Sequence, residues 1–269
     1  IYDLAHEIAE MALLEYGKPF GNQRFINRLP QHTLDLWEKA GVTPRAIDRE
    51  VSCALHMTHM GCSSLPEALV RQSIRTGLGD GWGGSMCGTE FSDVLFGTPK
   101  PIETEANLGV MNADNVNIVV HGHDPSLSEM VCEYADDPEM IAYAKEQGAK
   151  GITVSGVCCT SNEVAMRRGV PMAGNFLQQE NVVLTGACEA IVVDVQCIFP
   201  ALGPLSKCFH TKFITTSAIA RMPESEYIHF TVGTAAEKAK QIVKLACDNF
   251  KNRKPELVHI PDMKQKATV

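Results

Sequence analysis

Short apolar runs rich in β-branched residues dominate the second part of the chain. "VNIVV" (116–120), "GITVSGV" (151–157), "AIVVDVQ" (190–196) and "FITT" (213–216) have the length and composition of buried strands. Strands buried on both faces that alternate with helices indicate a parallel, doubly wound α/β sheet with right-handed crossovers. The intervening and following helices are predicted at 126–135, 138–147, 161–169, around 202–208 and at 235–250.

The first hundred residues show the pattern of helices instead. Apolar residues recur at helical spacing from Ile1 to Met11. Pro44 and Pro66 are suited to the first turn of a helix, and Gly77 is suited to end the second of these helices. We therefore expect a helical N-terminal segment before the sheet.

A glycine-rich stretch and a cluster of turn residues separate the two patterns. "GLGDGWGGSMCG" (77–88) is followed by "FGTPKP" (96–101), which predicts turns. We expect part of a helical domain over residues 1–104 and a Rossmann-like α/β domain over 105–269. Because the chain does not begin with Met and its first residues already read as helix, we expect it to be a piece of a longer protein.

Composition narrows the function classes. The apolar share of 45% and the charged share of 21% are ordinary for a globular protein. The net charge is −8, and the chain has no run of basic residues of the kind that binds nucleic acid. No apolar window approaches the roughly 20 residues of a membrane span, and no signal peptide is recognisable, so we expect a cytoplasmic protein. The ten cysteines include no CxxC pair, and most are expected to be buried apolar residues rather than disulfide partners.

Potential metal ligands follow three of the predicted strands. His121-Gly122-His123 ends the first, Cys158-Cys159 the second, and Cys197 follows the third, about one βαβ unit apart each time. The carboxyl ends of parallel strands meet at one edge of a sheet, where ligands bind. Because side chains alternate along a strand, only one of the two adjacent cysteines is expected to face that edge. The pattern predicts a metal or redox centre.

The choice of metal stays open at this point. Thiolates with one imidazole suit zinc, copper or an iron–sulfur cluster. Zinc sites usually contain a compact CxxC pair, which is absent, whereas iron–sulfur clusters accept ligands scattered across a fold. The structural alternative is that each histidine only forms hydrogen bonds at a strand end.

Long motifs in the same segments resemble the anaerobic nickel–iron carbon monoxide dehydrogenases. The resemblance includes "VNIVVHGHDPSLSEM", "GVCCTSNEVAMRRGVPMAGNFLQQE" and "AIVVDVQCIFP", and it extends through "DGWGGSMCGTEFSDVLFGTPKP" and "CFHTKFITTS" over nearly the whole chain. It implies an oxidoreductase that converts CO and water reversibly to CO2, two protons and two electrons. The implied cofactor is a nickel–iron–sulfur cluster of the Ni-4Fe-4S type.

The resemblance also assigns roles to individual residues. It implies that His123 and Cys159 bind the iron outside the cubane and that Cys197 binds another iron. His121 and Cys158 become packing residues or residues that orient the ligands.

The family uses a histidine, a lysine and an aspartate as acid/base groups around the substrate. Asp80 in "GLGDGWGG" is our candidate for the aspartate; the alternative is a turn residue among glycines. The lysine, three further cluster cysteines and the cysteines of the 4Fe-4S relay clusters are expected outside this chain. As given, the chain is therefore expected to be inactive alone.

The resemblance implies a homodimer and a ferredoxin-like electron carrier, with an acetyl-CoA synthase as a further candidate partner.

Four other functions are each compatible with part of the sequence. A hybrid-cluster-type oxidoreductase uses a different ligand set that includes a glutamate. A nicotinamide-dependent Rossmann enzyme would use "GDGWGG" (79–84), but this motif follows a helix rather than a strand. A thiol enzyme would use Cys159 with His123 or His210 as its base, which leaves Cys197 unexplained. A truncated or split paralogue would have no catalytic role.

Overall fold

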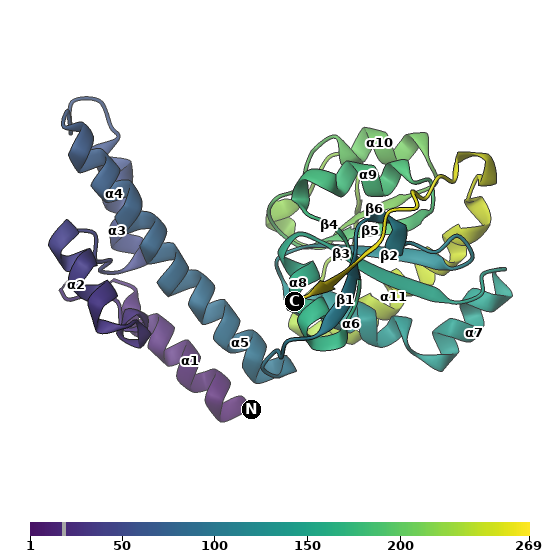
Figure 1. Ribbon diagram of the computed structural model, residues 1–269, viewed down its shortest axis with the longest axis horizontal. Helices are drawn as coiled ribbons and strands as arrows, with labels where there is room; N and C mark the ends of the chain where they lie inside the picture. Colours follow the sequence, from purple (N-terminus) through teal and green to yellow (C-terminus); the bar gives the residue numbers. More distant parts are fainter. Residues whose placement is uncertain (18–19) are drawn as a thin grey trace. The chain divides into compact units, whose positions relative to one another are not determined.

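The chain divides into two compact units, Ile1–Thr98 and Pro99–Val269. The structure is a computed structural model that describes residues 1–17 and 20–269. The first unit is made of helices, and the second is a sheet with helices packed on it (Figure 1). In the part of the chain described here, no helix combines the length and the apolar character needed to cross a membrane.

The first unit consists of helices. Its α4 continues without a break through a π-helical segment, η2, into α5, so the glycine-rich stretch is helical and Gly77 does not end α4. The expectation that Gly77 ends this helix is therefore wrong. Within the stretch, Gly83 is closely packed, because a Cβ there would lie 2.6 Å from Gln23 Nε2. The helical elements are α1 (Tyr2–Glu15), η1 (Phe25–Arg28), α2 (Gln31–Ala40), α3 (Ile47–Met57), α4 (Pro66–Gly79), η2 (Asp80–Ser85) and α5 (Met86–Phe96).

The second unit is built on an eight-stranded sheet with the order β7-β6-β5-β2-β3-β4-β1-β8. All its neighbouring strands are parallel except β8, which runs antiparallel to β1. The four runs expected from the sequence form β2, β3, β5 and β6. The strands are β1 (Glu103–Ala106), β2 (Val116–Gly122), β3 (Ile152–Val157), β4 (Met172–Gly174), β5 (Cys188–Val193), β6 (Lys212–Thr215), β7 (Glu226–Tyr227) and β8 (Gln265–Thr268).

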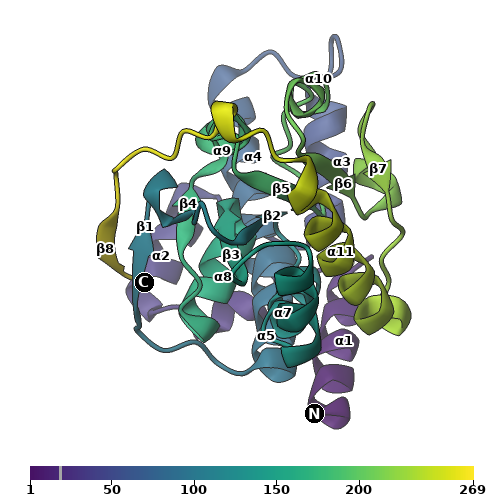
Figure 2. The same cartoon turned by 90° about the vertical axis from the view of Figure 1, so that its right-hand side faces the viewer.

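Helices cover both faces of this sheet, so the expected α/β class with a helical N-terminal segment is confirmed. Figures 1 and 2 show α6, α7 and α11 on one face and α9 and α10 on the other. Asp124 and Asp137 cap α6 and α7, each followed by a proline at the first helical position. The helices are α6 (Pro125–Ala135), α7 (Pro138–Glu146), α8 (Cys158–Arg168), α9 (Gln179–Leu184), α10 (Leu202–Cys208) and α11 (Ala235–Asn249).

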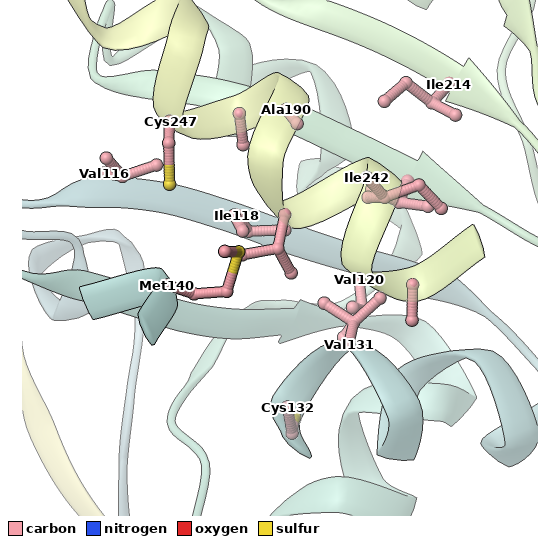
Figure 3. Close-up of a cluster of buried hydrophobic side chains, with 14 of the residues drawn as sticks. Val116, Ile118, Val120, Val131, Cys132, Met140, Ala190, Ile214, Ile242 and Cys247 are labelled. Atoms are coloured by element: carbon pink, nitrogen blue, oxygen red, sulfur yellow. The ribbon is translucent and has the colours of Figure 1, made fainter. Parts of the chain in front are cut away.

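Strand β2 lies at the centre of the unit and is buried along its whole length. Val116, Ile118 and Val120 pack toward α6, α7 and α11, as Figure 3 shows. Val119 packs on the opposite face, among residues of α9 and α10. Burying each such side chain contributes roughly 1.5–3 kcal/mol. The two cores hold the strand ends in fixed positions, which a site at those ends requires.

Candidate metal centre

The candidate ligands lie where the connections that follow two neighbouring strands go to opposite faces of the sheet. The chain leaves β2 toward the face covered by α6 and α7, and it leaves the neighbouring β5 toward the face covered by α10. A crevice forms at the carboxyl ends of two strands whose connections diverge in this way, and such crevices are the usual ligand sites of open α/β sheets. His123 follows β2 directly, and Cys197 lies in the loop that follows β5.

The glycine between the two histidines is required by a buried carboxylate. Gly122 has a φ of 124°, and a Cβ there would lie 2.0 Å from Asp194 Oδ1. The Asp194 carboxylate accepts the backbone N–H of His123 (2.6 Å) and of Asp124 (2.9 Å), and also that of Val195. Burial raises the pKa of Asp194 to about 7, although these three hydrogen bonds oppose the rise. Asp194 therefore ties the segment after β2 to the loop after β5.

A second hydrogen bond sets the orientation of the His123 ring. Its Nδ1 lies 2.9 Å from the backbone carbonyl oxygen of Val195. Because a carbonyl oxygen can only accept, Nδ1 carries the proton and Nε2 keeps a free lone pair. Nε2 lies 3.9 Å from Cys197 Sγ. This is the arrangement of a metal-binding histidine, whose other ring nitrogen donates to a fixed acceptor.

Two cysteines complete the group. One ligand atom each from His123, Cys158 and Cys197 lies within 4.8 Å of the other two. Cys158 (φ 70°), Gln196 (φ 62°) and Cys197 (φ 54°) all have left-handed backbone conformations, which are costly for residues other than glycine and cluster at functional sites. Burial, together with the neighbouring sulfurs of Cys159 and Cys197, raises the pKa of the Cys158 thiol to about 12. A bound cation would compensate thiolates packed this closely.

The structure brings His123 and Cys197 together as expected, with Cys158 as the third member. Both cysteines of the pair belong to the first turn of α8 rather than to the end of β3, so strand alternation does not apply to them. Cys159 is exposed and, like Cys158, lines a cavity of about 440 Å³. Among the described residues it is not part of the 4.8 Å group. Its role as a ligand stays a prediction.

The other candidates lie elsewhere. Asp80 is an exposed residue of the π-helical segment η2 in the first unit, not a turn residue, and its acid/base role stays a prediction. His121 is fully buried, with Nε2 3.1 Å from Gln179 Oε1. His210 bonds to Glu189 (2.8 Å) at the amino ends of β5 and β6. A strand of six residues places this end roughly 17 Å from the carboxyl rim, so His210 is not a base for Cys159.

The donor set fits the cofactor expected from the sequence. One imidazole nitrogen with a free lone pair and two sulfurs, drawn from three different strand ends, suit an iron–sulfur or another soft-metal centre. Sequence reasoning did not assign a role to Asp194, although it directly follows β5, or to Gln179. Neither residue matches a ligand motif, and both act through hydrogen bonds that only the fold brings together.

Comparisons with known proteins agree with this chemistry. The Prismane/CO dehydrogenase family model matches residues 1–267. Carbon monoxide dehydrogenase 1 of Methanosarcina mazei is 49% identical over 267 residues, 99% of this chain and 42% of the relative. The corresponding enzyme of Carboxydothermus hydrogenoformans is 45% identical over 271 residues, with coverages of 99% and 42%. The chain thus spans about two fifths of the length of these relatives.

Solved structures show the same similarity. A nickel-free carbon monoxide dehydrogenase from Thermococcus sp. AM4 superimposes with a TM-score of 0.94 at 51% identity, covering 99% of this chain and 42% of that one. An acetyl-CoA synthase/carbon monoxide dehydrogenase with nickel-containing [Fe4S4] clusters in its alpha subunits gives 0.90 at 39% identity, with coverages of 99% and 40%.

Proposed function

The chain belongs to the Prismane/CO dehydrogenase family, and from this premise we propose that it is part of an anaerobic nickel–iron carbon monoxide dehydrogenase. Such an enzyme is an oxidoreductase that converts CO and water reversibly to CO2, two protons and two electrons. The relatives named carbon monoxide dehydrogenase favour this activity over that of a hybrid-cluster protein.

In this proposal the carboxyl rim of the sheet contributes protein ligands to a nickel–iron–sulfur cluster. His123, through Nε2, and Cys159 would hold one iron of the cluster, and Cys197 would hold another. Cys158, whose sulfur lies beside the other two ligand atoms of its group, orients or shields the ligands. When bound, the cluster supplies Lewis acidity toward CO and water and accepts two electrons.

The tasks of the chain's own residues follow from their contacts. Val195 holds the tautomer of His123 through its carbonyl oxygen, and Asp194 holds the backbone of the same segment. Asp80 is the proposed acid/base residue, since a carboxylate can take part in general acid/base catalysis.

The proposal extends to partners and location. We place the enzyme in the cytoplasm as a homodimer that passes electrons through further 4Fe-4S relay clusters to a ferredoxin-like carrier. An acetyl-CoA synthase is a further candidate partner, because one structural relative is a complex with that enzyme.

The convergence of His123 and Cys197 is the observation that carries this proposal. The test is anaerobic reconstitution with iron and sulfide, followed by iron analysis and visible absorption. In the complete enzyme we expect Cys197→Ser to lower the iron content and the visible absorption by the share of the nickel–iron–sulfur cluster, while the relay clusters keep theirs. Cys208→Ser is the matched control, because Cys208 is also exposed but lies at the end of α10 and bonds to Pro204. Equal iron content in the two variants would overturn the proposal.

The activity itself is measured as CO-dependent reduction of methyl viologen. We expect it after nickel loading when the rest of the family's length is supplied, and not from these 269 residues alone. His123→Ala should abolish it in the complete enzyme. Undiminished dye reduction by that variant would contradict the role of His123.

A further inference from the structure

One buried side-chain amide connects both segments that carry the candidate ligands. Gln179 is the first residue of α9 and is fully buried. Its Nε2 donates to the backbone carbonyls of Phe176 (2.6 Å) and Cys197 (2.9 Å). Its Oε1 accepts from the backbone N–H of Phe199 (2.9 Å) and from Nε2 of His121 (3.1 Å). The amide thus uses both donors and both acceptor positions.

These bonds surround a strained part of the backbone. Gln196 (φ 62°) and Cys197 (φ 54°) are consecutive non-glycine residues in the left-handed region, which costs roughly 1–2 kcal/mol for each residue. Such strain persists only where the surroundings hold it. Gln179 bonds to the Cys197 carbonyl on one side and to the Phe199 N–H two residues further on. The direction in which the Cys197 thiol points therefore depends on this amide.

The same amide also bonds to the strand that carries the histidine. His121 is in β2, two residues before His123, and its ring is buried against Gln179. The Gln179 amide is thus bonded both to the strand that leads to His123 and to the loop that carries Cys197. The two candidate ligand atoms, His123 Nε2 and Cys197 Sγ, lie 3.9 Å apart.

We propose that Gln179 is a positioning residue that holds Cys197 at the correct distance and angle from His123 before metal binds. This inference rests on the proposed function, because it presumes that the two residues bind one metal centre. Gln179 does not touch the metal. It acts through the backbone of Cys197 and the ring of His121, as the outer-shell partners of metal ligands do.

The test uses Co2+ as a probe under anaerobic conditions. Thiolate-to-cobalt charge-transfer absorption reports binding, and only the part of the signal that His123→Ala removes is counted. Gln179→Met has a similar length but forms none of the four hydrogen bonds. We expect it to weaken Co2+ binding about 10- to 100-fold, the usual effect of removing an outer-shell partner.

Two further variants separate positioning from general stability. Gln72 is also a buried glutamine, in α4, and donates to the backbone carbonyl (3.1 Å) and the carboxylate (2.9 Å) of Glu50. Gln72→Met should lower stability but leave the Co2+ affinity within about twofold, since its side chain bonds to Glu50 and Thr76 and to neither ligand-bearing segment. Gln179→Glu keeps both accepted bonds and loses the donors, so an intermediate loss is expected.

Hydrogen exchange gives a readout that needs no metal. The Phe199 amide should exchange faster in Gln179→Met and stay protected in Gln179→Glu, which still accepts its bond. The Glu variant supports the full comparison if the Met variant does not fold.

The outcomes distinguish two failures. If His123→Ala leaves the cobalt signal unchanged, the metal centre itself is wrong and this inference falls with it. If His123→Ala abolishes the signal while both Gln179 variants bind Co2+ as the unaltered protein does, only the role of Gln179 is overturned.

Discussion

At the residue scale, buried polar side chains without a metal-ligand motif determine where the candidate ligands point. The Asp194 carboxylate accepts N–H groups from both ligand-bearing segments, and Gln179 bonds to both as well. Each of these residues is at least 96% buried, where an unmade hydrogen bond costs about 1–3 kcal/mol. The geometry of the site is therefore built into the folded chain.

Gly122→Ala should lower the free energy of unfolding by more than the positive φ of Gly122 alone would cause. The new Cβ would meet the Asp194 carboxylate, whereas Gly148, with a φ of 97°, has open space around the same position. We expect Gly148→Ala to cost about 1 kcal/mol and Gly122→Ala about 2–4 kcal/mol. Urea unfolding measures both. Equal losses of unfolding free energy in the two variants would show that the Asp194 carboxylate moves aside and does not fix the conformation of this turn.

Sequence reasoning placed His123 and Cys197 at one edge of the sheet because ligands gather at the carboxyl ends of parallel strands. The structure brings these two side chains to 3.9 Å of each other, and their binding of metal stays a prediction. Strand alternation predicted that only one of Cys158 and Cys159 faces the edge, and the family resemblance selected Cys159, yet both residues begin α8. Gln179 could not be predicted, because its four partners come together only in the fold.

At the scale of elements, β-branched composition decided which strands the sequence could predict. The runs that form β2, β3, β5 and β6 are rich in β-branched residues, although β6 itself has only four residues. The missed strands β1, β4, β7 and β8 have two to four residues each and show no period. The helical glycine-rich stretch was missed because glycine favours turns unless, as at Gly83, another side chain approaches closely.

A buried ion pair joins the elements at the amino ends of the strands. Glu189 in β5 bonds to the Arg253 guanidinium at 2.7 Å through each carboxylate oxygen and also accepts the Asn117 N–H of β2. Glu189→Gln should lower the free energy of unfolding by about 3–5 kcal/mol, because Arg253 would be left buried without its counter-charge. The exposed pair Asp114–Lys150 is the control, and Asp114→Asn should cost less than about 1 kcal/mol. Comparable losses in urea unfolding would refute this account.

A second carboxylate makes the helical unit sensitive to acid. Burial alone would raise the pKa of Glu50, but hydrogen bonds from Arg45 and Gln72 lower it below its ordinary value of 4.5. The unfolded state then binds the proton more readily than the folded state, so this contribution is present above about pH 4.5 and is lost as the pH falls through the lower folded value. Circular dichroism during acid titration should show that the helix content of Glu50→Gln falls less steeply with decreasing pH than that of the unaltered protein. An unchanged acid transition would count against this role.

At the scale of the whole molecule, the two units differ in how much apolar surface they bury. Both buried hydrophobic clusters belong to the second unit. Among the described residues of the first unit, the buried apolar side chains are Phe25, Ile26, Val42 and Ala46, and many large apolar ones are exposed. A unit with so few buried apolar contacts is expected to open first.

Hydrogen exchange with mass spectrometry measures this difference directly. We expect residues 1–98 to exchange with lower protection than the β2–β3–β5 core and to unfold at lower urea concentration. A single cooperative transition with equal protection in both units would contradict the expectation.

The central claim is that His123 and Cys197 bind the same metal centre, and iron anomalous diffraction from anaerobic crystals of the reconstituted protein tests it most directly. We predict an iron peak within bonding distance of His123 Nε2, further iron bonded to Cys197 Sγ in the same cluster, and a bond from Cys159 that identifies the third ligand. Iron bound elsewhere, or a filled cluster that leaves either His123 or Cys197 unbonded, would contradict the account.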